Sequence, residues 1–231
     1  MNHQDPNLAV VELVAAALGP LRSELVLVGG CSVGLLITDR ARPPVRQTVD
    51  VDLVAEVTSR LGYYALCEEL RQRGFQESAA ADHMCRWKRG ELLLDVMPSD
   101  DAILGHSANR WYPYAVSSAN RLLLPSGSAM LVIAPPLFLA TKLEAFHDRG
   151  QGDYGHHDME DIINVVDGRP ELVEEVDQTS TEVRTFIRNE FDYLLADADF
   201  VDGIPRHLRT DAASQARAAT IVERLQRLAG L

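Results

Sequence analysis

The chain has few cysteines, no long apolar run and no basic leader, and each absence excludes a class of protein. Its three cysteines, Cys31, Cys67 and Cys85, form neither a zinc-binding spacing nor a disulfide framework, so we expect buried free thiols. The most apolar stretch, AMLVIAPPLFLA, is too short to span a bilayer and contains two prolines. The start, MNHQDPNLAV, lacks the basic-then-apolar order of a secretory signal. The sequence therefore predicts a cytoplasmic protein with no membrane partner.

Basic residues are also few in comparison with acidic ones. The 231 residues include 22 Lys and Arg against 34 Asp and Glu, which gives a formal net charge of −12. Such a surface repels polyanions, so nucleic-acid binding would need a local basic patch. A hydrophobic fraction of 46% is sufficient for a packed core. The length suits one α/β core with a helical extension.

The pattern of apolar residues changes character near residue 134. Before that point, ELVLVGG, TVDVDLVAEV, HMCRWK, ELLLDVM, RLLLP and MLVIA predict strands, and SRLGYYALCEELRQRGF predicts an amphipathic helix. We expect a hairpin turn at Arg89-Gly90 and a loop over residues 98–120. From Pro135 onward the segments predict helices only. We therefore predict an α/β core over residues 1–134 and a helical subdomain over residues 135–231.

Two aspartates stand two positions apart in TVDVDLV. Because side chains alternate along a strand, Asp50 and Asp52 are expected on one face, with Val49, Val51 and Leu53 facing the core. Two parallel carboxylates repel each other unless a cation is present, and Mg²⁺ prefers carboxylate oxygens as ligands. A solvated strand face with two ordinary acids would give the same pattern, so neighbouring features must decide.

Two neighbouring features favour a metal site. In LVGGCSVGLL, a predicted strand ends at Gly29-Gly30 and a helix follows at once, which is a geometry that binds phosphate through backbone N–H groups. A glycine pair also marks ordinary tight turns. Asp95, in ELLLDVM, completes a trio of carboxylates if its strand lies beside that of Asp52. Otherwise it is simply an acid near a strand end.

This order of glycine pair, helix, spaced acids and later acid resembles the nucleotidyltransferase superfamily. The longer string R-x-T-x-D-x-D-L, from Arg46 to Leu53, is similar to the branch named for the AbiEii/AbiGii-type toxins of abortive-infection and toxin–antitoxin systems. That branch also carries a helix with a lysine and a later arginine, then an aspartate-rich helix, which match FLATKLEAFHDR and HHDMEDI. One departure is His157, where the branch often has lysine. The resemblance covers about residues 24–167.

The resemblance implies a nucleotidyltransferase-like mixed sheet with flanking helices, followed by a helical subdomain that completes the nucleotide site. It implies an enzyme that uses Mg²⁺ or Mn²⁺ to move an NMP group from an NTP to an acceptor hydroxyl. The catalytic and metal-binding residues would be Asp50, Asp52 and Asp95, with Asp95 binding the metal or taking the hydroxyl proton. The nucleotide-binding residues would be Gly29, Gly30, Ser32, Arg46, Lys142 and Asp158.

The acceptor stays open at this point. A toxin-like enzyme would modify tRNA or a protein and would have a cognate antitoxin protein as partner. A resistance-type enzyme would modify a small molecule such as an aminoglycoside. A catalytically silent module with this fold would only bind a partner protein. The acid trio argues against the silent module, because a silent site has no reason to keep a costly cluster of acids.

Three further groups of charged residues have alternative interpretations. The arginines at positions 40, 42 and 46 can meet phosphates or RNA, or can belong to a solvated loop. His156 and His157 are adjacent on a helix and point in different directions, so one metal is not expected to bind both. Lys142 is expected on a cationic helix face with Arg149. Its replacement by alanine is then expected to weaken NTP binding with little change in melting temperature.

Overall fold

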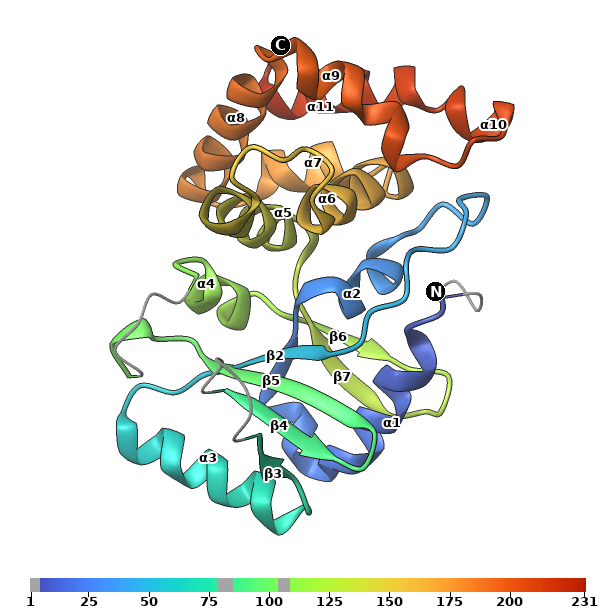
Figure 1. The fold of residues 1–231 in the computed structure, drawn as a ribbon. Helices are drawn as coiled ribbons and strands as arrows, with labels where there is room; N and C mark the ends of the chain where they lie inside the picture. The colour runs from blue at the N-terminus through green and yellow to red at the C-terminus, as the bar shows by residue number, and fades with distance from the viewer. Residues whose placement is uncertain (1–4, 79–84, 104–108) are drawn as a thin grey trace. The chain divides into compact units, whose positions relative to one another are not determined.

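The computed structural model describes residues 5–78, 85–103 and 109–231, which divide into two compact units. The sheet unit contains residues 5–35 and Pro44–Ala134 (Figure 1). The helical unit contains Pro135–Leu231 and also the short segment Leu36–Pro43. Leu36–Pro43 therefore lies between the two sequence segments of the sheet unit but belongs to the helical unit.

The sheet unit is built on a mixed sheet of seven strands in the order β3-β4-β5-β2-β1-β7-β6. The pairs β2/β5 and β1/β7 are parallel and the other pairs are antiparallel. The strands are β1 (Leu25–Leu27), β2 (Val51–Ala55), β3 (Gln76–Glu77), β4 (Arg86–Arg89), β5 (Leu92–Pro98), β6 (Asn120–Leu123) and β7 (Ala129–Val132). The predicted fold class, a mixed α/β sheet followed by helices, is confirmed.

Four helices accompany the sheet: α1 (Leu8–Leu18), α2 (Gly29–Leu36), α3 (Arg60–Gln72) and α4 (Tyr112–Ser117). Short 3₁₀ turns follow α1 at Gly19–Ser23 and β5 at Asp101–Ile103. Helix α3 is capped by Ser59, whose hydroxyl accepts a hydrogen bond from the Gly62 N–H. Helix α4 corrects the expectation of a loop over residues 98–120. It forms because Pro113 suits a first helical turn and Trp111 is buried just before it.

Alternation along β2 and β5 sorts core residues from polar ones. Val51 pairs with Leu94 and Leu53 with Val96, and all four side chains are buried. Val49 was expected in this core set, and that prediction is wrong, because Val49 is 82% exposed. Strand β2 begins only at Val51, where pairing with β5 starts, so Val49 and Asp50 lie in a bend before it.

The hairpin between β4 and β5 also differs from expectation by one residue. Arg89 pairs with Leu92, so the two turn residues are Gly90 and Glu91 rather than Arg89 and Gly90. Gly90 has a φ of +58°, which fits a tight hairpin turn with glycine at its first central position.

The helical unit packs its first two long helices, α5 (Pro135–Ala145) and α6 (His157–Gly168), against each other. A π-helical turn at Phe146–Gly150 ends the first of them. The others are α7 (Leu172–Gln178), α8 (Thr181–Leu195), α9 (Ala198–Gly203), α10 (Ala212–Gln215) and α11 (Ala218–Ala229), with a 3₁₀ turn at Ile204–His207. Among the described residues, we find no helix with the length and apolar character needed to cross a membrane.

The segment Leu36–Pro43 is fastened to α6 by backbone and charge. The N–H groups of Thr38 and Asp39 both donate to the carbonyl of Gly168, at 3.0 and 2.9 Å. Arg42 is buried, and its Nε lies 3.0 Å from a carboxylate oxygen of buried Asp167. Arg42 is therefore neither a solvated loop residue nor a free cation for phosphate or RNA. Arg217, just before α11, reaches the same aspartate at 2.7 Å.

Candidate active site

A row of charged side chains crosses three neighbouring strands of the sheet unit. Asp52 on β2 stands directly opposite Asp95 on β5, and Asp95 stands opposite Arg86 on β4. Residues that are directly opposite on paired strands project from the same face of a sheet. Strands β2 and β5 are visibly adjacent in Figure 1. The strand of Asp95 thus lies beside that of Asp52, which is the condition that the predicted carboxylate trio requires.

The Arg86 guanidinium forms hydrogen bonds to the carboxylates of both Asp50 and Asp95. Its Nε and Nη2 donate to the two oxygens of Asp95 at 2.7 and 2.6 Å, and Nη2 also donates to Asp50 at 2.8 Å. The Nη2 atom of Arg86 reaches both Asp50 and Asp95, so Asp50 belongs to the row although it precedes β2. The acidic row therefore consists of Asp50, Asp52, Asp95 and Arg86. Hydrogen bonds to Asp95 and the surrounding negative charge raise the pKa of Arg86 above its usual range. The sequence pattern did not single out Arg86, although the apolar Trp87 beside it, which is buried, leaves Arg86 on the opposite face of its strand.

The glycine turn touches the same row. Gly29 begins α2 with a φ of +63°, a conformation that strains other residues. A Cβ placed on Gly29 would overlap the Asp52 carboxylate and lie 2.9 Å from the Asp52 Cβ. Gly30 follows as the second residue of the helix. The backbone at Gly29 therefore lies closer to Asp52 than it could if residue 29 had a Cβ atom.

Replacing Gly29 by alanine is expected to destabilise the sheet unit and to displace Asp52. The positive φ alone costs about 1–2 kcal/mol for an L-residue, and the steric overlap adds to it. Gly90→Ala is the matched control, because Gly90 has a similar φ and nothing within 4 Å of its Cβ position. Denaturant unfolding of both variants measures the difference. Equal losses of stability would contradict the close approach of Gly29 to Asp52.

Two hydrogen bonds hold the turn and the acidic segment in place. The Ser32 hydroxyl donates to the Gly29 carbonyl at 2.8 Å, and Ser32 is completely buried. The Cys31 thiol donates to the Asp50 carbonyl at 3.4 Å. The structure thus gives Ser32 a place in shaping the turn, and its expected contact with a phosphate stays a prediction.

Asn7 fixes the chain that leads into the acidic segment. Its buried amide donates to the Arg46 carbonyl at 3.0 Å and accepts from the Thr48 N–H at 2.9 Å, as a neighbouring strand would. The positive charge of Arg46 affects the pKa of Cys31, whose thiol is bonded to the Asp50 carbonyl. Burial raises the pKa of the Cys31 thiol, the charges of Asp52 and other aspartates raise it further, and Arg46 opposes them. Arg46 therefore acts electrostatically on Cys31, next to Gly30, and its expected contact with a nucleotide stays a prediction.

The donor set of the row suits a divalent cation. Three carboxylates and one guanidinium give the four side chains a formal charge of −2, and carboxylate oxygens are the ligands that Mg²⁺ and Mn²⁺ prefer. The Asp50 side chain is 32% exposed, so an ion can reach it from solvent. Asp50 engages Arg86 through Oδ2, and no described residue bonds its Oδ1. The donor chemistry of Asp50 and Asp52 fits the metal that the resemblance implies, whereas both Asp95 oxygens are bonded to Arg86 and the three carboxylates do not converge within 4.8 Å of one another.

In the helical unit, Lys142 is buried in an ion-pair cluster. Its Nζ lies 2.8 Å from an oxygen of Asp158 and 2.8 Å from an oxygen of Asp161. Arg149 adds two hydrogen bonds to Asp158 at 2.7 and 2.8 Å. The four formal charges sum to zero. The expected cationic face is therefore neutralised, and Lys142→Ala is instead expected to lower the melting temperature. Contact of Lys142 and Asp158 with a nucleotide stays a prediction.

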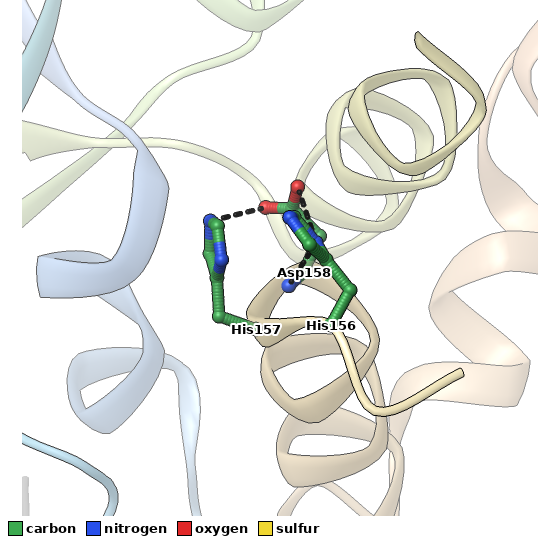
Figure 2. Close-up of side chains that lie close together, drawn as sticks. All are labelled: His156, His157 and Asp158. Atoms are coloured by element: carbon green, nitrogen blue, oxygen red, sulfur yellow. Dashed lines mark hydrogen bonds and ion pairs between the residues drawn. The ribbon is translucent and has the colours of Figure 1, made fainter. Parts of the chain in front are cut away.

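His156 and His157 lie beside the same aspartate, as Figure 2 shows. The prediction that they point in different directions is wrong, because His156 precedes α6 and the two ring centroids lie 3.9 Å apart. With Asp158 they are the one group of three His, Cys, Asp or Glu residues, among those described, whose ligand atoms all lie within 4.8 Å. Both Asp158 oxygens are already occupied by Arg149 and Lys142, so a metal would compete with two cations. Burial would raise the pKa of Asp158, but these two cations outweigh it and hold that pKa well below its usual range. His156 also caps α6 by accepting the Asp158 N–H. The acidic row therefore remains the better candidate for a divalent cation.

Comparison with known proteins identifies the fold. No family model matches the chain, and no curated protein is similar to it in sequence. An antigenic nucleotidyltransferase-like protein from Paracoccidioides brasiliensis has a TM-score of 0.53 and 20% identity, over 92% of this chain and 98% of that one. The antibiotic-resistance factor ANT(2'')-Ia gives a TM-score of 0.47 and 17% identity, over 82% of this chain and 95% of that one. JHP933 from Helicobacter pylori gives 0.48 and 12%, over 100% and 94%. The first of these similarities shows that this chain has the fold of a nucleotidyltransferase-like protein.

Proposed function

We propose that the protein is a metal-dependent nucleotidyltransferase that moves an NMP group from an NTP to an acceptor hydroxyl. The observation that carries this proposal is the close approach of Gly29 to Asp52. It brings a helix-starting glycine turn, which suits phosphate, against a carboxylate row, which suits a divalent cation. The nucleotidyltransferase-like fold supports the same conclusion.

In this proposal the chain contributes mainly position and charge. The first N–H groups of α2, at Gly29 and Gly30, bind phosphate oxygens of the NTP. Asp50 and Asp52 hold Mg²⁺ or Mn²⁺, which when bound would neutralise charge on the phosphate oxygens. The acceptor oxygen bonds to the α-phosphorus, the bond from that phosphorus to the bridging oxygen breaks, pyrophosphate leaves, and the hydroxyl proton passes to solvent. The resemblance further proposes Ser32, Arg46, Lys142 and Asp158 as nucleotide-binding residues.

The acceptor class follows from two different observations. Resemblance to the AbiEii/AbiGii-type branch supports tRNA or a protein as acceptor and an antitoxin as partner. The formal net charge of −12 instead favours a small cationic acceptor, such as an aminoglycoside, over a polyanion. We propose the toxin-like reaction as the first candidate and the small cationic acceptor as the second.

A transfer assay tests the function and separates the acceptors. Each NTP, labelled at its α-phosphate, is incubated with the protein and Mg²⁺ in the presence of total RNA, lysate protein or a panel of aminoglycosides. Label is expected to move from one preferred NTP to one acceptor class, and EDTA or Asp52→Asn is expected to abolish the transfer. If no NTP labels any acceptor, the silent partner-binding module becomes the better interpretation.

A further inference from the structure

The Arg86 guanidinium is a fixed part of the acidic row. Arg86 on β4 pairs with Asp95 on β5 in the sheet. Its side chain makes two hydrogen bonds to Asp95 and one to Asp50, at 2.6 to 2.8 Å. Bidentate pairs of this kind are among the strongest hydrogen-bonded contacts in proteins. Only 21% of the side chain is exposed. Because a guanidinium does not lose its proton in proteins, the row contains a permanent positive charge.

This charge limits how many metal ions the row can hold. Both Asp95 oxygens already accept hydrogen bonds from Arg86, whereas Asp50 is engaged through only one oxygen. One divalent cation brings the formal charge of the row from −2 to zero. A second would leave the row positive and would have to displace Arg86 from Asp95. In a site with two metals, both ions use the same group of carboxylates. Here the Asp95 carboxylate is already bonded to Arg86.

We propose that the row binds a single divalent cation, held by Asp50 and Asp52, and that Arg86 takes the place of a second cation on Asp95. This inference rests on the proposed function and makes its metal requirement specific. Asp95 is then a positioning residue that holds Arg86, and neither a metal ligand nor the group that takes the proton of the acceptor hydroxyl. Arg86 supplies positive charge beside the reacting phosphate and, unlike a bound metal ion, cannot exchange with ions in solvent.

Manganese binding without nucleotide tests this proposal. The protein is titrated with Mn²⁺ alone, and free Mn²⁺ is counted by electron paramagnetic resonance. The wild type is expected to bind one Mn²⁺ per chain and Arg86→Gln to bind two. Lys88→Gln removes a charge from the same face of β4, where Lys88 is exposed, and is expected to bind one. Two ions in the wild type, or one in a folded Arg86→Gln variant, would overturn the inference.

A second variant keeps the test decisive if Arg86→Gln does not fold. Asp95→Asn is expected to keep one Mn²⁺ with an affinity within about twofold of the wild type, because Asp50 and Asp52 hold the ion. Loss of binding in this variant would make Asp95 a ligand and overturn the inference. His157→Ala is expected to leave the count unchanged, which separates the acidic row from the histidine pair. A wild type that binds no Mn²⁺ without nucleotide would overturn this inference, whereas the metal dependence of the proposed function is tested separately by the effect of EDTA on transfer.

Discussion

Replacing Lys142 by methionine is expected to lower the free energy of unfolding by about 3–5 kcal/mol, the usual cost of removing one partner from a buried ion pair. The change leaves Asp158 and Asp161, both almost completely buried, without the ammonium that lies 2.8 Å from each. Arg149 still reaches Asp158, so that carboxylate keeps one of its two cations. Denaturant unfolding followed by circular dichroism measures the effect.

The protein offers a natural control for this experiment. Lys88 is the only other lysine in the sequence and is exposed on β4, so Lys88→Met is expected to change stability by less than about 0.5 kcal/mol. A double variant, Lys142→Met with Asp161→Leu, is expected to recover part of the loss, because it removes both partners of one pair. A Lys142→Met variant as stable as the wild type would show that the ammonium is not held by these carboxylates.

Replacing Asp50 and Asp52 together by asparagine is expected to abolish metal-supported NTP binding while the fold survives. The change removes both proposed ligands of the ion but keeps their size and leaves the Arg86 pair with Asp95 in place. In calorimetric titrations, the variant in Mg²⁺ is expected to bind NTP no more tightly than the wild type in EDTA. Circular dichroism checks that the variant is folded.

A double variant of two exposed acids in the sheet unit separates ligand loss from a general change of charge. Glu56→Gln with Glu91→Gln also removes two negative charges, and it is expected to keep the full increase in NTP affinity that Mg²⁺ produces in the wild type. If Mg²⁺ still strengthens NTP binding to the Asp50 and Asp52 variant, the metal lies elsewhere. The cluster around His156 and His157 would then be the next place to look.

The acidic row shows what the sequence could predict and where it had to fail. Alternation along β5 places Asp95 away from buried Leu94 and Val96, and this local pattern is visible in the letters. The pairing of β5 with β2 is a long-range contact that no local pattern specifies. Arg86 was missed for a more definite reason. Placing the turn one residue early shifts the hairpin register by two, which sets Arg86 opposite Leu93 rather than Asp95.

Lys142 was misjudged because a helix pattern describes only its own residues. A lysine beside an apolar stripe is typical of a solvated helix face. The carboxylates that bind it come from α6, sixteen and nineteen positions later, and every side chain from Pro135 to Leu143 is buried. Burial on all sides follows from how helices pack in the helical unit, which the periodicity of α5 alone does not contain.

The division of the chain into units also sets an order of events during synthesis. The sheet unit has all of its strands once Val132 is made, with residues 36–43 as a loop that it can leave open at modest entropic cost. That loop emerges early from the ribosome, and Arg42 has to wait for Asp167 before it can be buried. The helical unit is therefore not a separable C-terminal module. A cut before Pro135 would remove a piece of its interior along with the sheet.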